Sequence, residues 1–350
     1  MKKSLPLLSV LSLGLIFGGP IDITSKTATA ASHGKKVEWN LSTWGKRRAF
    51  TEGIEAVSKY VSDKSEGHFT IKINYGGSLS KPRENLDGIS LGAFEAATFC
   101  ASYHADKNKS VTVLELPFLP ISNGNVQKAA DLAVYSHPAT IKEMAKWNAK
   151  LMMSAALPQY EFMGRGKEPK SIEDFKGMRV RALGGIGKAM KVIGAVPTTV
   201  TAPETYTAIE SGTVDAAAFA LYSHFSYKIN EVATWRTTNL SPGSVNCPLV
   251  VNIDAYNSLS DKNKKILTAA VDAGYAALDK AYSASMTKFI PMADKQGIKK
   301  ITYSETELAA FRKVAAKPVW DKWIEEANAV GLPAQELLDL VLKASKEASK

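Results

Sequence analysis

Strand patterns and helix patterns alternate along this chain, and no other sequence feature constrains its fold as strongly. Residues 37–42 have a strand pattern, and residues 69–75 alternate with the two-residue period of a half-buried strand. Residues 48–64, between them, form an amphipathic helix pattern, and a short apolar strand is expected at 93–99. Strands alternating with helices predict a mainly parallel sheet covered by helices.

The same alternation restarts after Pro158. A Gly-rich turn is expected at 184–187, ahead of a helix at 188–193. Further strands are expected at 177–181, 197–200 and 214–219, a helix at 203–211, and long C-terminal helices at 261–288, 305–330 and 333–350. Two α/β units joined by crossing strands form a crevice at the carboxyl ends of their strands, which suits ligand binding.

The N-terminus has the layout of a secretory signal. Lys2 and Lys3 precede an apolar stretch at 5–19, and Ala28-Thr29-Ala30 forms a small-residue cleavage pattern. The apolar stretch is short for a transmembrane helix, although an N-terminal membrane anchor is the alternative. We therefore expect residues 1–30 to be removed near Ala30 and the mature chain to be exported.

The basic charge does not indicate nucleic acid binding. The formal net charge is +10, and it becomes +8 without residues 1–30, which hold three Lys and one Asp. The basic residues are scattered among acidic ones, with no arginine-rich tract or zinc-finger spacing. A solvated surface explains them, and a modest positive field can attract small anions.

Motifs of catalysis and metal binding are absent from the sequence. It has no G-x-S-x-G, H-E-x-x-H or C-x-x-C, and its five histidines are dispersed. We expect no catalytic residue, no metal ligand set and no cofactor. The apolar neighbours of Cys100 and Cys247 favour buried free thiols, while export leaves a disulfide open.

One constellation between Ser171 and Ala216 is informative. The chain has S-I-E-D-F-K-G-M-R-V-R, then G-A-V-P, then A-P-E-T-Y-T-A-I-E-S-G-T-V-D-A. This pattern resembles the DctP-type solute-binding proteins of tripartite ATP-independent periplasmic (TRAP) transporters. Segments at 66–71, 76–79, 116–119 and 259–260 also resemble that family in the same order.

The resemblance implies that Arg181 holds the carboxylate of a ligand. Its planar guanidinium can pair with a carboxylate through two hydrogen bonds. The alternative is a surface ion pair with Glu204 or Asp215.

Two departures from the family pattern bear on the ligand. Glu161 stands where many relatives have a second arginine, and Ala218-Phe219-Ala220 stands where many have an Asn. Sialic-acid-like and dicarboxylic ligands are therefore expected to fit less well. If Glu161 faces the site, it could accept a hydrogen bond from a ligand hydroxyl or pair with a cationic group. An aromatic wall would favour an aromatic acid, a hydrophobic keto acid or a cation. Its candidate residues are Trp44, Tyr103, Phe219, Tyr222 and Trp235, with Tyr160 beside them.

The fold class expected is thus α/β, a two-lobe periplasmic binding protein fold with crossing strands between the lobes and a long C-terminal helical region. We expect residues 31–157 and 247–286 in lobe I, and residues 158–246 and 287–350 in lobe II. The function implied by the resemblance is a periplasmic receptor that captures a small organic acid, a monocarboxylate that is aromatic or zwitterionic, and delivers it to integral membrane TRAP subunits. We expect it to act as a monomer, without nucleic acid. The alternatives are an ABC-type receptor and an exported lyase or isomerase.

Overall fold

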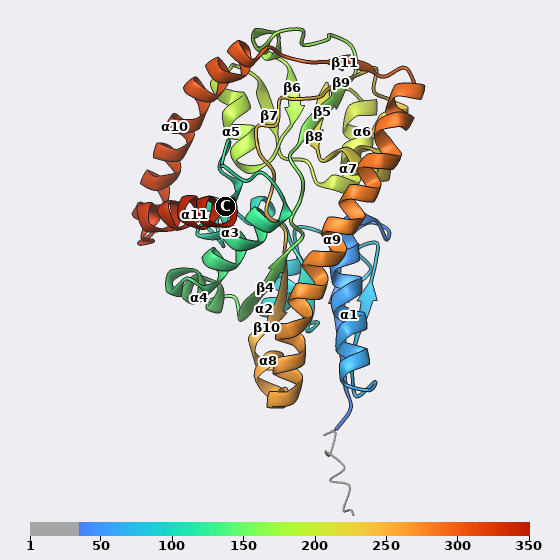
Figure 1. The fold of residues 1–350 in the computed structure, drawn as a ribbon, viewed down its shortest axis with the longest axis vertical. Coiled ribbons are helices and arrows are strands. Elements are labelled where there is room, and N and C mark those ends of the chain that lie inside the picture. The colour runs from blue at the N-terminus through green and yellow to red at the C-terminus, as the bar shows by residue number, and fades with distance from the viewer. Residues whose placement is uncertain (1–34) are drawn as a thin grey trace, which may run out of the picture. The chain divides into compact units, whose positions relative to one another are not determined.

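The computed structural model describes residues 35–350, so the expected signal and its cleavage site lie outside the described residues. Two sheets organise this part of the chain (Figure 1). The first has the order β2-β1-β3-β10-β4 and comprises β1 (Val37–Ser42), β2 (Phe69–Asn74), β3 (Ala96–Thr98), β4 (Ala149–Ser154) and β10 (Pro248–Asn252).

The second sheet has the order β11-β9-β5-β8-β6-β7. Its strands are β5 (Glu161–Gly164), β6 (Arg179–Arg181), β7 (Val196–Thr198), β8 (Ala216–Phe219), β9 (Trp235–Thr237) and β11 (Lys299–Ile301). The chain passes between the sheets at 155–160 and again at 238–247. The two-lobe α/β fold predicted from the sequence is confirmed.

Both sheets are mixed rather than mainly parallel. β10 runs antiparallel to β3 and β4, and β5 runs antiparallel to β8 and β9, while β1 pairs in parallel with β2 and β3. The two reversed strands are those that follow the crossings at 155–160 and 238–247, while a third crossing through α9 leads to β11, which pairs in parallel with β9.

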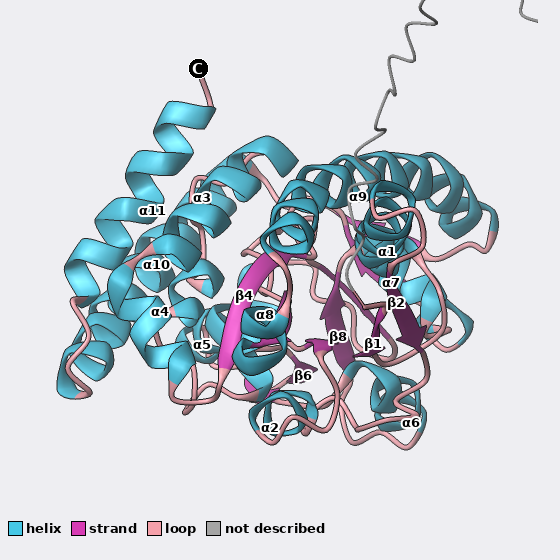
Figure 2. Cartoon of the chain, turned by 90° about the horizontal axis from the view of Figure 1, so that it is seen from below, coloured by secondary structure: helices cyan, strands magenta, loops and turns pink. Residues whose placement is uncertain are grey.

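The helices cover both sheets (Figure 2). They are α1 (Glu52–Lys64), α2 (Asn85–Ser90), α3 (Gly124–Ser136), α4 (Pro138–Ala145), α5 (Gly184–Val192), α6 (Thr205–Glu210), α7 (Leu221–Ser226), α8 (Ile253–Ser258), α9 (Asp261–Lys295), α10 (Glu305–Ala329) and α11 (Ala334–Ala348). The expected Gly-rich turn at 184–187 is instead the first turn of α5. No helix among residues 35–350 combines the length and apolarity needed to cross a membrane.

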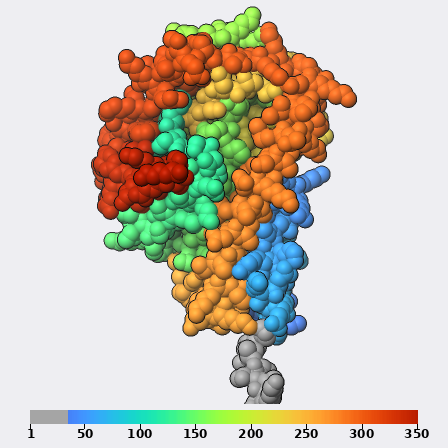
Figure 3. Space-filling model, in the orientation of Figure 1, coloured from blue at the N-terminus to red at the C-terminus, as the bar shows by residue number. Residues whose placement is uncertain are grey.

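α9, the longest helix among the described residues, contacts β4 of the first sheet and α7, which follows β8 of the second sheet. The Ser260 side chain caps its first turn by accepting from Asn263 N at 3.2 Å. α9 packs against α1 and β4 at one end and against α7 further along. A Cβ at Gly274 would come within 2.5 Å of Met153 Sδ, so the glycine lets the helix lie close to β4. Figure 3 shows the outer face of α9 (orange) between α1 (blue) and α3 (teal).

The C-terminal helices return to the first sheet. Ser304 and Glu307 form a capping box at the start of α10, and α10 contacts α5. α11 packs on α3, and Trp323 and Leu337 share a buried cluster with apolar residues of β3 and β10. The residue boundaries of the two lobes remain a prediction.

Candidate functional site

Side chains from both sheets meet around one buried cavity. Arg181 ends β6 and Phe219 ends β8, while Cys100 follows β3 of the first sheet. Ligands of α/β proteins bind at the carboxyl ends of parallel strands, where the connecting loops diverge. Seven aromatic side chains line the cavity: Trp44, Phe50, Tyr103, Tyr160, Phe219, Tyr222 and Tyr227.

Arg181 is 1% exposed, and its guanidinium is held in one orientation. Nε donates to Val200 O at 3.0 Å, Nη1 donates to Ala218 O at 2.8 Å, and Nη2 donates to the Tyr103 hydroxyl at 3.4 Å. These neutral acceptors fix the side chain but leave its positive charge uncompensated. A desolvated cation of this kind favours an anionic partner.

Within residues 35–350, no carboxylate pairs with Arg181, so the alternative of a surface ion pair is wrong. Asp215 pairs instead with Arg179, whose Nη2 lies 2.5 Å from Asp215 Oδ1. Glu204 accepts from Thr201 Oγ1 at 2.6 Å. The charge of Arg181 therefore remains available to a ligand.

Phe219 forms the wall beside Arg181. The centre of its ring lies 4.0 Å from the guanidinium carbon of Arg181 and 5.8 Å from the ring of Tyr227, on which it stacks at 22°. The ring of Tyr160 lies 6.2 Å away. Aromatic faces next to a guanidinium suit a flat acid that pairs with the cation and stacks on the rings.

Tyr103 joins the first sheet's half of the site to the second. Its hydroxyl accepts from Ala202 N at 2.9 Å in addition to its bond with Arg181. Arg83 lies over the Tyr103 ring at 5.3 Å and donates to Thr199 O at 2.9 Å. These bonds hold the two sides of the cavity together, so the arrangement described is a closed one.

The structure brings five of the seven predicted site residues to this cavity: Trp44, Tyr103, Arg181, Phe219 and Tyr222. Trp235 does not line it, because it is fully buried within the second sheet. Glu161 does not line it either, and its carboxylate accepts from Thr237 Oγ1 at 2.5 Å and from Ser241 N at 2.9 Å. Burial raises the pKa of Glu161, and these bonds oppose that rise.

Sequence reasoning missed Arg48, Phe50 and Tyr227. Arg48 directly precedes the short helical turn Ala49–Thr51, and its guanidinium carbon lies 4.5 Å from the ring centre of Phe50. No family motif identified this position. The sequence did contain a signal for this position. An arginine between two aromatic residues follows the first strand, and the end of that strand is where a ligand crevice is expected.

Cys100 and Cys247 form a disulfide that lines the cavity. The expectation of free thiols was wrong. The apolar sequence context indicated burial correctly, but it did not show that β3 and β10 are neighbours in the sheet. Cys100 lies just beyond Phe99, which follows the end of β3, and Cys247 directly precedes β10, so the bond joins neighbouring strand ends.

A buried carboxyl, Glu115, lies where α5 meets the first sheet's half of the molecule. It accepts from Asn246 N at 3.0 Å and from the hydroxyl of Ser102. Burial raises the pKa of Glu115 to about 7. A Cβ at Gly184 would meet its carboxylate, and one at Gly185 would overlap its backbone oxygen. Only glycines let α5 approach this closely.

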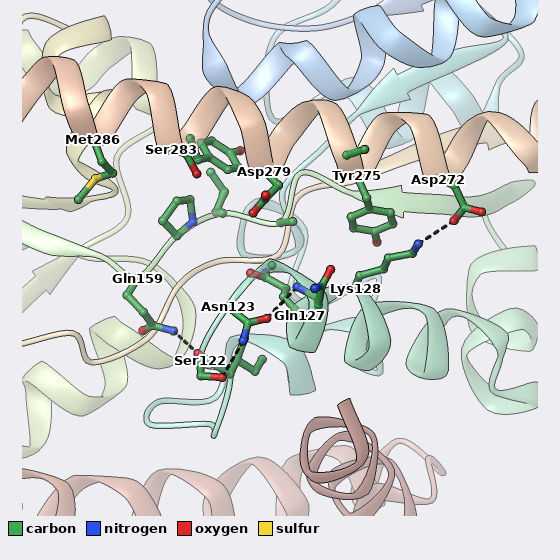
Figure 4. Close-up of a pocket in the computed structure, with 18 residues that line it drawn as sticks. Ser122, Asn123, Gln127, Lys128, Gln159, Asp272, Tyr275, Asp279, Ser283 and Met286 are labelled. Atoms are coloured by element: carbon green, nitrogen blue, oxygen red, sulfur yellow. Dashed lines mark hydrogen bonds and ion pairs between the residues drawn. The ribbon is translucent and has the colours of Figure 1, made fainter. Parts of the chain in front are cut away.

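A larger cavity, of about 500 Å³, lies elsewhere in the described residues. Figure 4 shows it between α9 and the start of α3, where Lys128 points toward Asp272 at 2.7 Å. The positive charge of Lys128 is thus compensated by Asp272, and Asp279 adds a negative charge to the cavity wall. Because these carboxylates repel another anion, this cavity suits an acid poorly. The Arg181 cavity leaves only about 20 Å³ unfilled, room for about one water molecule.

Three or more His, Cys, Asp or Glu side chains do not converge on a candidate metal site anywhere in residues 35–350. The donors at the Arg181 cavity are arginine and tyrosine groups, which suit an anion rather than a cation. The fold and the site together define a two-lobe solute-binding protein.

Residues 42–326 match the family of bacterial extracellular solute-binding proteins, family 7, known as DctP. The chain belongs to this family, whose members are periplasmic TRAP solute receptors and not enzymes. The predicted family is thus confirmed, and the lyase or isomerase alternative is not supported.

Individual relatives and solved structures are consistent with this family assignment. A monocarboxylate 2-oxoacid-binding periplasmic protein of Nostoc is 25% identical over 305 residues, covering 82% of this chain and 83% of the relative. A marine metagenome TRAP protein specific for aromatic acid ligands, solved with 3-hydroxybenzoate, superposes with a TM-score of 0.80 at 21% identity over 90% of this chain and 100% of that one. A protein from Rhodoferax ferrireducens solved with benzoate gives 0.79 at 18% identity, covering 90% of this chain and 99% of that one.

Proposed function

We propose that this chain is a periplasmic receptor that captures a small aromatic or other flat organic acid and delivers it to the membrane subunits of a TRAP transporter. The observation that carries the proposal is Arg181, a buried cation without a carboxylate partner among residues 35–350, set against the ring of Phe219. A ligand carboxylate supplies the missing charge, and the aromatic walls supply dispersion and stacking contacts.

The ligand would be trapped by closure of the lobes. The cavity leaves almost no free space, and its walls are joined by bonds such as that from Ala202 N to Tyr103. A ligand can enter and fit only when the two sides lie further apart than they do here, and it favours the ligand-bound closed state to the extent that it binds that state more tightly. The closed receptor then docks on the membrane subunits.

The proposal also covers signal cleavage, the monomeric state and the lobe boundaries. We propose cleavage near Ala30, and we propose that the receptor acts as a monomer with the lobe boundaries given above. Mass spectrometry of the protein recovered from the periplasm gives the mature N-terminus, and light scattering gives the mass in solution.

A thermal-shift screen followed by calorimetry tests the function. Benzoate, 3-hydroxybenzoate, phenylpyruvate, pyruvate and ectoine are offered to the mature protein, because a ligand of the native state raises the melting temperature by mass action. We expect at least one aromatic acid to bind with micromolar or tighter affinity. The absence of any carboxylate ligand, or full affinity in Arg181→Lys, contradicts the proposal.

A further inference from the structure

A second cation, Arg48, lines the same cavity as Arg181 but comes from the first sheet's half of the molecule. Its Nη1 donates to Trp44 O and to Lys46 O, both at 2.9 Å. Its guanidinium carbon lies 4.5 Å from the ring centre of Phe50 and 5.5 Å from that of Tyr227. The side chain is therefore held in place by backbone carbonyls and aromatic faces.

Two polar groups at this end of the cavity have no hydrogen-bond partner among the described residues. They are Nε of Arg48 and the hydroxyl of Tyr227, and both atoms are buried. The indole of Trp44 approaches the hydroxyl without the geometry of a hydrogen bond. A buried donor that stays unpaired costs free energy, so both groups favour a ligand that brings an acceptor oxygen.

The two arginines also share an unbalanced charge. Neither pairs with a carboxylate within residues 35–350, in contrast to the neighbouring Arg47, which lies 2.8 Å from Glu52. Two like charges in one poorly solvated cavity repel each other, and a ligand with a single negative group compensates only one of them. A dianion would compensate both.

The stacked pair of Phe219 and Tyr227 separates the two anchors. Arg181 lies against Phe219 and Arg48 lies against Tyr227, and the ring centres are 5.8 Å apart. The two negative groups of the ligand must therefore be held apart by a spacer. An aromatic ring fits this requirement, because it is rigid and can stack on the same pair of rings.

We propose that Arg48 and Tyr227 form a second anchor that selects a diacid, namely an aromatic acid with a second carboxylate at a distance from the one held by Arg181. This inference rests on the proposed function and names its substrate class. It also revises the expectation from the sequence. Glu161 occupies the position where a second arginine was sought, but Arg48 supplies the second cation from a different part of the chain.

Calorimetry with three matched ligands tests the proposal. Benzoate has one carboxylate, 3-hydroxybenzoate adds a hydroxyl, and benzene-1,3-dicarboxylate adds a second carboxylate. We expect the dicarboxylate to bind about tenfold or more tighter than benzoate, since a charge-assisted bond contributes that much, with the hydroxy acid between them.

The variants Arg48→Gln and Tyr227→Phe show whether the preference arises at this anchor. We expect Arg48→Gln to weaken the dicarboxylate about tenfold or more and benzoate less than about threefold, with partial rescue in Arg48→Lys. Tyr227→Phe keeps the ring and should lower only the dicarboxylate and hydroxy-acid affinities. Arg47→Gln is the matched control, because it removes an adjacent arginine that is paired with Glu52 at the surface.

The outcomes separate this inference from the proposed function. Equal losses for all three ligands in Arg48→Gln, or no preference for the dicarboxylate in the unmodified protein, overturn the second anchor while leaving the acid receptor intact. If the unliganded melting curve shows that Arg48→Gln does not fold, the affinities of Tyr227→Phe for the three ligands test the second anchor instead. If none of the acids binds the unmodified protein, the proposed function itself fails.

Discussion

The central guanidinium carbon of Arg181 lies 4.0 Å from the centre of the Phe219 ring. One residue ends β6 and the other ends β8, and these two strands are parallel neighbours in the second sheet. Strand pairing therefore sets the distance between the proposed anchor and its aromatic wall. The Arg181 side chain also stabilises the fold, because it donates hydrogen bonds to the carbonyl oxygens of Val200 and Ala218.

Arg181→Ala should therefore affect both binding and stability. It leaves the buried carbonyl oxygen of Ala218 and the partly buried one of Val200 without this donor, and the loss at the buried oxygen costs about 1–3 kcal/mol. We expect the ligand-induced thermal shift to disappear and the unliganded protein to melt at a lower temperature. Arg179→Ala is the control on the same strand, since its exposed pair with Asp215 contributes only about 0–1 kcal/mol. An unchanged ligand shift in Arg181→Ala would reject the assignment.

Gly185→Ala should impair ligand binding without unfolding the protein. The added Cβ overlaps the backbone oxygen of Glu115, so α5 cannot approach as closely as it does in this structure. We expect affinity to fall about tenfold, equivalent to about 1.4 kcal/mol, in calorimetry. The overlap also strains the packing seen in this structure, so the unliganded melting temperature should fall modestly while the protein stays folded.

The control for this experiment is Gly124→Ala. Gly124 also begins a helix, but its added Cβ would lie 3.4 Å from Asp279 Oδ1, an ordinary contact. The Gly124→Ala variant should bind the ligand with the same affinity as the unmodified protein. If Gly185→Ala binds equally well, the close approach of α5 is not needed for capture.

Reduction of the Cys100–Cys247 bond should destabilise the protein. The bond closes a long loop, with a sequence separation of 147, and removing a native disulfide costs about 2–5 kcal/mol. Urea unfolding with and without reductant measures the difference, and the Cys100→Ser, Cys247→Ser double variant provides the same comparison without reductant. A thiol reagent should find no free thiol in the unreduced, unfolded chain; two reactive thiols would contradict the pairing.

The contribution of two buried carboxyl groups to stability should fall as the pH rises from about 4 to about 7, while burial of His224, which lowers the pKa of that side chain to about 3, acts in the opposite direction. Burial raises the pKa of Glu115 and that of Asp131 to about 7, from ordinary values of 4.5 and 3.8. In this window the unfolded chain has lost these protons and the folded chain retains them, so each unit of pH lowers the free energy of unfolding. Above both raised values, this contribution is lost and no further change is expected from these two groups.

Glu115→Gln and Asp131→Asn test the origin of that dependence. Each variant removes one titrating group while keeping an amide that can accept from Asn246, whose N and Nδ2 donate to the two carboxyls at 3.0 and 2.8 Å. Between pH 4 and pH 8, the slope of melting temperature against pH should be less negative in each variant than in the unmodified protein. A slope identical to that of the unmodified protein would show that other groups control it.

The candidate site was only partly predictable because its members come from distant segments. The motif around Arg181 and Phe219 was identified because those residues lie in one contiguous pattern. Arg48 and Tyr227 escaped notice because nothing local places them together. Glu161 was assigned to the site by position, but the donors of the segment 237–241 hold its carboxylate elsewhere.

The order of strands and helices, the approximate bounds of most of them and the family were determined by local periodicity and motif spacing. Those properties depend on neighbours in the sequence, so one chain is enough to predict them. Strand direction after each crossing, the disulfide and the second arginine in the cavity were decided by tertiary structure. Each of these depends on how distant backbone segments pack, and hydrophobic burial fixes that packing only when the whole chain folds.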